Sequence, residues 1–282
     1  MLKKILPLSF TLITLLFTYS CTDTDPLQKT AIVITVDGLS FANTISSQPF
    51  LNDNNYLKTA LDGMQLSSKG LEIVSFNWDR NVSNSDIGIQ SLINKLREYY
   101  NRAINENKKL IIVSHSWGTF LSFMALASES QGTNPIKCDL FITLSSPIGT
   151  AYSSHRSKTE DIINSYVNSW FTKLNYNITS GILPKAKKWI NVWAWGDYIS
   201  GPLKEINPAI QDIQVEGDLY KISPVTRDII TTYVFHRYTQ LLPESKDRLL
   251  IERIKEEIST AADNSYTPTA PLNLSFIKDT KR

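Results

Sequence analysis

Short apolar runs rich in β-branched residues alternate with helical patterns along the first half of the chain. The runs are residues 31–36, 71–76, 110–115 and 140–144. Runs of this kind are typical of strands buried on both faces, as in a parallel sheet. The segments between them carry helical patterns, the longest at residues 86–107. Three strand–helix repeats predict an α/β fold with a doubly wound, mostly parallel sheet and flanking helices.

The third run ends in a tight turn that carries a serine. The segment Leu110-Ile-Ile-Val-Ser-His-Ser-Trp-Gly118 passes from a strand pattern directly into a helical pattern. Such a turn requires small side chains two positions before and two positions after the serine, and Ser114 and Gly118 meet that requirement. We therefore expect the hydroxyl of Ser116 at the tip of a strand-to-helix turn.

This segment resembles the nucleophile elbow of the α/β-hydrolase superfamily, in its lipase and esterase branch, with S-H-S-W-G in place of G-x-S-x-G. The resemblance implies a serine hydrolase that cleaves a carboxylic ester, lipid-like esters included, through an acyl-enzyme on Ser116. It also implies a small helical cap. The aromatic, amphipathic pattern at about residues 151–187 occupies the cap's place, although an ordinary surface helix packed on the sheet would show the same pattern.

A serine nucleophile needs a base and an orienting acid, which the superfamily supplies in the order Ser, acid, His. His236 follows a β-rich run late in the chain and is the expected base. We expect His115 to be a buried packing residue and His155 to lie at the surface or touch substrate. Asp197 follows a predicted strand at residues 189–195 and is the expected acid, unless it only caps a turn. The alternative acids are Asp212, Asp218, Asp228 and Asp79.

Two backbone N–H groups should stabilise the oxyanion that forms when a serine attacks an ester. By the resemblance, one is the N–H of Trp117, which lies at a helix N-terminus where the helix dipole favours negative charge. The other is the N–H of Leu39 in Asp37-Gly38-Leu39, which occupies the place of the family's His-Gly-x. The departure from the family pattern is Asp37.

The N-terminus resembles a bacterial lipoprotein signal. Two lysines precede an apolar stretch at residues 5–17, which is too short to span a bilayer as a helix. Cys21 follows, so the resemblance implies that residues 1–20 are removed as a signal peptide and that Cys21 is acylated. Tyr19 departs from the small residue that such signals prefer. The alternative is an ordinary exported protein in which Cys21 has no special role.

If Cys21 is acylated, the protein is tethered through its lipid to a membrane of the bacterial cell envelope, on the periplasmic or the cell-surface side. Residues 21–30 are then a polar tether, residues 31–262 form the hydrolase domain, and residues 263–282 are a loose C-terminal tail. Cys138 is the only other cysteine, so no internal disulfide is expected.

The composition of the chain argues against nucleic-acid and metal partners. Residues 1–20 hold two of the 29 basic residues and no acid, so the mature chain balances 27 acids with an equal number of bases. That balance lacks the basic surplus typical of nucleic-acid binding, so no nucleic-acid partner is expected. The three histidines and two cysteines show no metal-ligand spacing, so neither a metal nor another cofactor is expected.

Two functions of different kinds fit these features. The first is the ester hydrolase, whose partner is a small-molecule or lipid ester. The second is a non-catalytic, membrane-tethered lipoprotein that uses the hydrolase fold as a binding scaffold, because a fold does not fix a function. The complete set of Ser116, Asp197 and His236 favours the enzyme.

Overall fold

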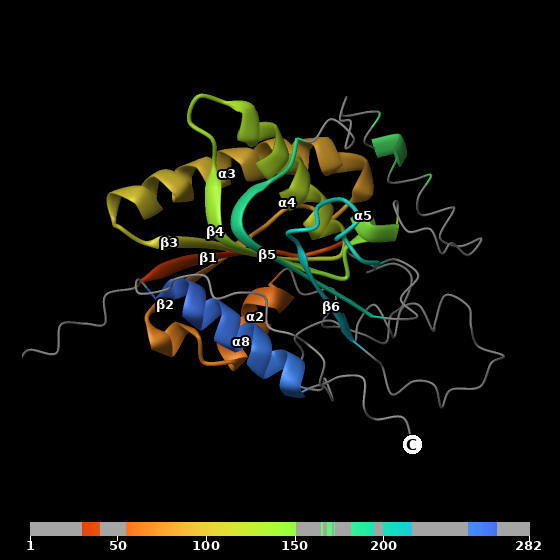
Figure 1. Cartoon of the computed structure of the whole chain (residues 1–282). Coiled ribbons are helices and arrows are strands. Elements are labelled where there is room, and N and C mark those ends of the chain that lie inside the picture. The colour runs from red at the N-terminus through yellow and green to blue at the C-terminus, as the bar shows by residue number, and fades with distance from the viewer. Residues whose placement is uncertain are drawn as a thin grey trace, which may run out of the picture.

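The computed structural model places six strands in one sheet between two layers of helices (Figure 1). The residues that the structure describes are 30–39, 55–150, 165, 168–170, 172, 182–194, 200–215 and 248–263. The strands are β1 (Ala31–Val36), β2 (Leu71–Phe76), β3 (Lys109–His115), β4 (Lys137–Leu144), β5 (Lys185–Ala194) and β6 (Gln211–Val215). The helices are α2 (Tyr56–Gly63), α3 (Ser85–Asn105), α4 (Trp117–Ser128), α5 (Pro147–Thr150) and α8 (Arg248–Ala262). Three short 3-10 turns are η2 (Ser67–Lys69), η3 (Val82–Asn84) and η4 (Glu129–Gln131).

All five strand pairs in this sheet are parallel, and the strand order is β2-β1-β3-β4-β5-β6. Parallel neighbours require crossover connections, and α2, α3 and α4 lie between successive strands in the sequence. The expectation of a mostly parallel sheet with flanking helices is therefore confirmed. Because every strand runs the same way, their carboxyl ends lie at one edge of the sheet, where ligands bind in folds of this kind.

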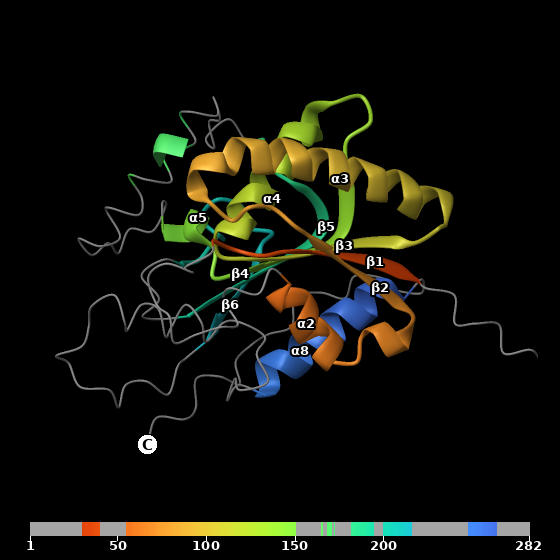
Figure 2. The same cartoon turned by 180° about the vertical axis from the view of Figure 1, so that it is seen from behind.

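The helices cover opposite faces of the sheet: α3 and α4 on one side, α2 and α8 on the other (Figures 1 and 2). The buried residues form two clusters that match these layers. In β1, Ile32 and Ile34 belong to the α3 and α4 side, whereas Ala31 and Val33 belong to the α2 and α8 side. Strands buried on both faces explain the continuous apolar runs in the sequence.

Two details of α3 differ from the sequence-based expectation. Ile87 and Ile104 lie within the helical pattern at residues 86–107 but are 63% and 57% exposed. The buried positions follow a narrower stripe, made of Ile89, Leu92, Leu96, Tyr99 and Ala103. The helix also ends two residues before Asn107, which has a left-handed φ of 50°. The N–H of Lys108 then donates to the carbonyl of Ala103 at 2.7 Å, closing the last turn.

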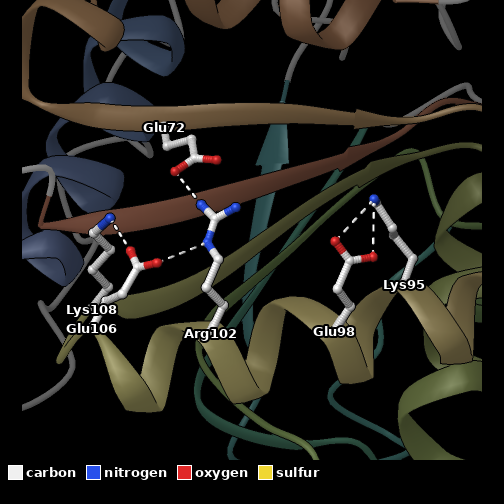
Figure 3. Close-up of polar contacts among 6 residues, drawn as sticks. All are labelled: Glu72, Lys95, Glu98, Arg102, Glu106 and Lys108. Atoms are coloured by element: carbon white, nitrogen blue, oxygen red, sulfur yellow. Dashed lines mark hydrogen bonds and ion pairs between the residues drawn. The ribbon is translucent and has the colours of Figure 1, made fainter.

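Ion pairs lie along α3 and just beyond its end, and one of them connects the helix to the sheet (Figure 3). Arg102 pairs with Glu72 of β2 and, at 3.4 Å, with Glu106. Lys108 also pairs with Glu106, and Lys95 pairs with Glu98 at 3.2 Å. These groups are partly exposed, and each such pair adds only about 0–1 kcal/mol.

Strand β6 was not expected from the sequence. Its residues Gln-Asp-Ile-Gln-Val are mostly polar, and among the described strands it lies at one edge of the sheet, beside β5. An edge strand needs less apolar surface, so its sequence shows no buried-strand pattern. The expected signal peptide (residues 1–20) and C-terminal tail lie outside the described residues, apart from Asp263. Among the described residues, no helix has the length and apolar character needed to cross a bilayer.

Candidate active site

Ser116 lies between the last residue of β3 and the first residue of α4, as the elbow pattern predicts. Its backbone has φ 53° and ψ −130°, in the positive-φ region that L-residues rarely occupy. Hydrogen bonds hold both sides of the turn: the N–H of Ser116 donates to Leu144 of β4 at 2.9 Å, and its carbonyl accepts from the N–H of Thr119 at 2.9 Å. Strain of this kind persists where the surrounding structure enforces it, and it is concentrated at active sites.

The two small residues around Ser116 have separate structural reasons. A Cβ on Gly118 would lie 2.4 Å from the carbonyl oxygen of Val36, so only glycine fits where α4 approaches the end of β1. Ser114 is buried, and its hydroxyl is hydrogen-bonded to the hydroxyl of Ser122 on α4 at 2.7 Å. This bond explains how serine replaces the usual glycine at that position, because its polar group has a partner.

The loop Asp37-Gly38-Leu39 lies directly beside the serine. A Cβ on Gly38 would lie 2.6 Å from Cβ and 3.2 Å from Oγ of Ser116, so the close approach requires glycine at position 38. Asp37 stands where the family has histidine. Its carboxylate accepts a hydrogen bond from the N–H of Leu57 at 3.2 Å, near the N-terminus of α2, where the helix dipole favours a negative charge.

Tyr56 connects this loop to His115. Its hydroxyl accepts a hydrogen bond from the N–H of Gly38 at 2.9 Å and shares a short hydrogen bond with Nδ1 of His115. Burial, with a smaller contribution from the negative charge of Asp37, raises the pKa of Tyr56, so the hydroxyl stays protonated. His115 is 2% exposed and packs edge-on against the ring of Tyr56, in agreement with its expected packing role.

Two residues after β2 hold the same loop and were not predicted from the sequence. Trp78 Nε1 donates to the carbonyl of Asp37 at 2.9 Å. Arg80 donates through Nε to the carbonyl of Gly38 at 2.6 Å and through Nη2 to that of Leu39 at 2.9 Å. The only sequence signal for Arg80 is its position shortly after the end of a strand that neighbours β1.

Two of the alternative acids, Asp79 and Asp212, make hydrogen bonds to nearby turns and loops. Asp79 accepts hydrogen bonds within its own exposed turn, from the N–H of Asn81 and the side chain of Asn84. Asp212 of β6 accepts from Asn191 Nδ2 at 2.7 Å and from the N–H groups of Leu203 and Lys204. These bonds use both carboxylates to fix loops.

The remaining sequence-predicted site residues divide into two groups. Leu39 and Trp117 are described: Leu39 is partly buried beside Gly38, and Trp117 is buried at the start of α4. The other expected residues, Asp197, His236, His155, Asp218, Asp228 and Cys21, lie outside the described residues. Within the described ranges, no group of three or more His, Cys, Asp and Glu side chains could hold a metal ion.

A six-stranded parallel sheet with a serine held at a strained strand-to-helix turn defines the chain as an α/β-hydrolase. Residues 26–180 match the family described as "Putative serine esterase (DUF676)". The match covers more than half of the chain and includes Ser116, so the chain belongs to this family and is a hydrolase of the serine esterase class. No curated protein matches the chain.

Solved structures with similar folds include esterases and a lipase. A double mutant of esterase E40 has a TM-score of 0.54 at 10% identity over 84% of this chain and 79% of its own. A soluble variant of monoglyceride lipase from Saccharomyces cerevisiae has 0.51 at 11% identity, covering 85% and 88%. A phosphonate-inhibited esterase B from Lactobacillus rhamnosis has 0.51 at 11% identity, covering 82% and 76%. At these identities the similarity establishes the fold.

Proposed function

We propose that the protein hydrolyses carboxylic esters through an acyl-enzyme on Ser116, with His236 as the general base and Asp197 as the acid that orients it. The observation that carries this proposal is the conformation of Ser116, at φ 53° and ψ −130° between β3 and α4. A buried serine forced into this region beside a glycine-bearing loop has the setting of a nucleophile.

The order of the strands supports the choice of acid and base. Asp197 is three residues beyond Ala194, the last residue of β5, and His236 follows β6 in the sequence. Because β3, β5 and β6 are parallel, segments that follow them start from the same edge of the sheet as Ser116. The hydrogen bonds that occupy Asp212 and Asp79 also favour Asp197 over those two residues.

In this mechanism, Oγ of Ser116 attacks the ester carbonyl carbon while the imidazole of His236 takes its proton. The carbonyl oxygen becomes an oxyanion, which accepts hydrogen bonds from the N–H groups of Leu39 and Trp117. Collapse breaks the bond to the alcohol, which leaves with the proton from His236. Water then gives a proton to His236 and attacks the acyl-enzyme, which releases the carboxylic acid and restores Ser116.

Labelling with a fluorophosphonate probe tests this proposal. We expect wild-type protein to be labelled, Ser116→Ala to be unlabelled, and His236→Ala and Asp197→Ala to hydrolyse p-nitrophenyl butyrate at least about 1000-fold more slowly. Ser145→Ala is the matched control for the serine, because Ser145 also has a positive φ, 52°, at the end of a strand. An unlabelled but folded wild type would favour the non-catalytic scaffold instead.

The substrate in this proposal is an ester with an apolar acyl group. Trp117, the residue after the nucleophile, packs edge-on against Trp170 with ring centroids 6.5 Å apart. Trp170 comes from the segment expected to form the cap, so this contact supports an aromatic cover near Ser116. The esterase B neighbour was solved with a tributyrin phosphonate inhibitor. A series of p-nitrophenyl esters with increasing chain length should show higher kcat/KM for butyrate or longer chains than for acetate.

The membrane association in this proposal comes from a lipid on Cys21, which places the hydrolase at a membrane of the bacterial cell envelope. In a bacterial host, we expect wild-type protein and Cys138→Ala to incorporate labelled palmitate and sediment with membranes. Cys138 is the matched control because it is the only other cysteine. Cys21→Ala should incorporate no palmitate, and incorporation by that variant would contradict the anchor.

A further inference from the structure

Three successive carbonyl groups after β1 are held by the segment that follows β2. Trp78 holds the carbonyl of Asp37, and the guanidinium of Arg80 holds those of Gly38 and Leu39. Arg80 is only 3% exposed, although arginine is rarely buried to this extent without partners. Its position therefore costs desolvation, which the two carbonyl bonds and a cation–π contact with Tyr56, at 5.3 Å, offset.

The bonds to this loop determine which of its N–H groups can serve an oxyanion. The N–H of Gly38 donates to the hydroxyl of Tyr56 at 2.9 Å. No described residue accepts a hydrogen bond from the N–H of Leu39. The carbonyl of Gly38 and the N–H of Leu39 belong to one trans peptide, so they point in opposite directions. The bond from Arg80 Nε to the Gly38 carbonyl therefore fixes the direction of the Leu39 N–H.

Arginine suits this task better than lysine. Its planar guanidinium presents several N–H donors in a fixed fork, which lets one side chain bind two neighbouring carbonyls at once. A positive charge beside the carbonyl oxygen also draws electron density from the peptide nitrogen, so the N–H on the same peptide becomes a stronger donor.

We propose that Arg80 is a positioning residue for the oxyanion hole: by binding the carbonyls of Gly38 and Leu39, it aims the Leu39 N–H at the oxygen that becomes charged when Ser116 attacks an ester. The inference rests on the proposed function. It predicts that the loss of Arg80 weakens stabilisation of the transition state and leaves binding of the uncharged substrate nearly unchanged.

The test compares Arg80→Met, Arg80→Lys and wild type on p-nitrophenyl butyrate. We expect Arg80→Met to lower kcat about 10- to 100-fold, with KM within about twofold of wild type, because an interaction made only in the transition state is affected. Arg80→Lys keeps the charge but not the fork, so its kcat should be intermediate. It also provides a folded variant if the methionine variant is unstable.

A matched control separates this role from a general structural one. Arg97 of α3 also donates to a backbone carbonyl, that of Asn134 at 2.7 Å, and pairs with Glu129. Arg97→Met should therefore change stability without changing kcat. Inhibition by a trifluoromethyl ketone, which forms an oxyanion on Ser116, gives a second readout. Its Ki should rise in each Arg80 variant by about the same factor as kcat falls.

The outcomes distinguish the two proposals. If wild-type protein neither reacts with fluorophosphonate nor cleaves the ester, the proposed function fails and the role of Arg80 fails with it. If wild type is active but a folded Arg80→Met or Arg80→Lys keeps kcat and Ki within twofold of wild type, only the role of Arg80 is wrong. A rise in KM with unchanged kcat would also overturn it.

Discussion

At the scale of single residues, Ser116 shows how the fold holds a reactive group in place. A positive φ costs a non-glycine residue about 1–3 kcal/mol, and here the bonds to Leu144 and Thr119 maintain it. Because the strain belongs to the backbone, removing the hydroxyl does not relieve it. Removing the Cβ, as in a glycine variant, relieves the strain.

We therefore expect Ser116→Gly to be more stable than Ser116→Ala by about 1 kcal/mol, since glycine occupies positive φ readily. Urea unfolding of the two inactive variants measures the difference. Ser128 is the control, because it is the last residue of α4 with φ −60°. There Ser128→Gly should be less stable than Ser128→Ala by about 0.5–1 kcal/mol. Equal stability of the two Ser116 variants would contradict a strained elbow.

Gly118 lies where α4 approaches the end of β1, so replacing it tests how close that approach is. A Cβ would lie 2.4 Å from the carbonyl oxygen of Val36, so Gly118→Ala must push α4 away from β1. We expect a loss of about 2 kcal/mol or more in the free energy of unfolding, together with most of the esterase activity. A Cβ added to Gly63 of α2 would meet no atom within 4 Å, so Gly63→Ala should be neutral or stabilising by up to about 1 kcal/mol. A tolerated Gly118→Ala would show that the approach is not tight.

Sequence patterns predict these residues unequally. The elbow at Ser116 is local, so its small neighbours and flanking strand can be recognised directly. The partners of the neighbouring loop cannot be recognised in that way. Tyr56 and Arg80 reach Gly38 from 18 and 42 positions away, one within and one just beyond the crossover that joins β1 to β2. Their role depends on which strands become neighbours, which local spacing does not encode.

At the scale of elements, the end of β5 is organised by a buried amide. Asn191 of β5 is fully buried, accepts from Thr143 at 3.0 Å, and donates to Gly201 and Asp212. Asp212 in turn holds the N–H groups of Leu203 and Lys204. This network fixes Gly201, Leu203 and Lys204, which follow the expected acid in the sequence by four to seven residues.

Asn191→Ala should cost about 2–4 kcal/mol in the free energy of unfolding, because it removes the three hydrogen bonds to Thr143, Gly201 and Asp212. In the proposed enzyme, it should also lower kcat, since the segment that carries the expected acid loses its anchor. Urea unfolding and ester hydrolysis measure the two effects. Asn207→Ala is the control: its side chain only accepts from the exposed N–H of Ala209, so a change below about 1 kcal/mol is expected. A similar small change at Asn191 would contradict the network.

The sequence predicts elements well where strands are buried on both faces and poorly where they are not. Each of β1 to β5 contains an apolar run, so its position can be predicted to within a few residues, although the lysine-rich start of β5 at residues 185–188 lies outside its run. β6 has Gln, Asp and Gln among its five residues, and it pairs with β5 in the sheet. The two ends of α3 similarly extend beyond the stripe that contacts the sheet.

At the scale of the whole molecule, the reactivity of the buried Cys138 thiol measures how often the sheet and its two helical layers open. The thiol is 1% exposed on β4, and burial, together with the charge of Asp139, raises its pKa. A raised pKa leaves less thiolate at a given pH, and the thiolate is the reactive form. The native protein should therefore protect this thiol.

In a Cys21→Ala variant, where Cys138 is the only thiol, we expect iodoacetamide at pH 8 to react at least about 1000-fold more slowly with native than with urea-unfolded protein. That ratio corresponds to an opening free energy of about 4 kcal/mol, because each factor of ten equals about 1.4 kcal/mol. Mass spectrometry over a time course measures the rate. Complete modification of native protein as fast as of the unfolded chain would show that the sheet opens locally at β4.

The attachment of Arg80 to the loop after β1 has a consequence for recombination among related hydrolases. A crossover between residues 39 and 80 would join a loop from one parent to the following segment of another. The strands pair through backbone hydrogen bonds, which do not depend on the parent's side chains, so such offspring would retain the parallel sheet and yet lose turnover. Breakpoints placed before Ala31 or after Asn84 would inherit both partners together and should give active chimeras more often.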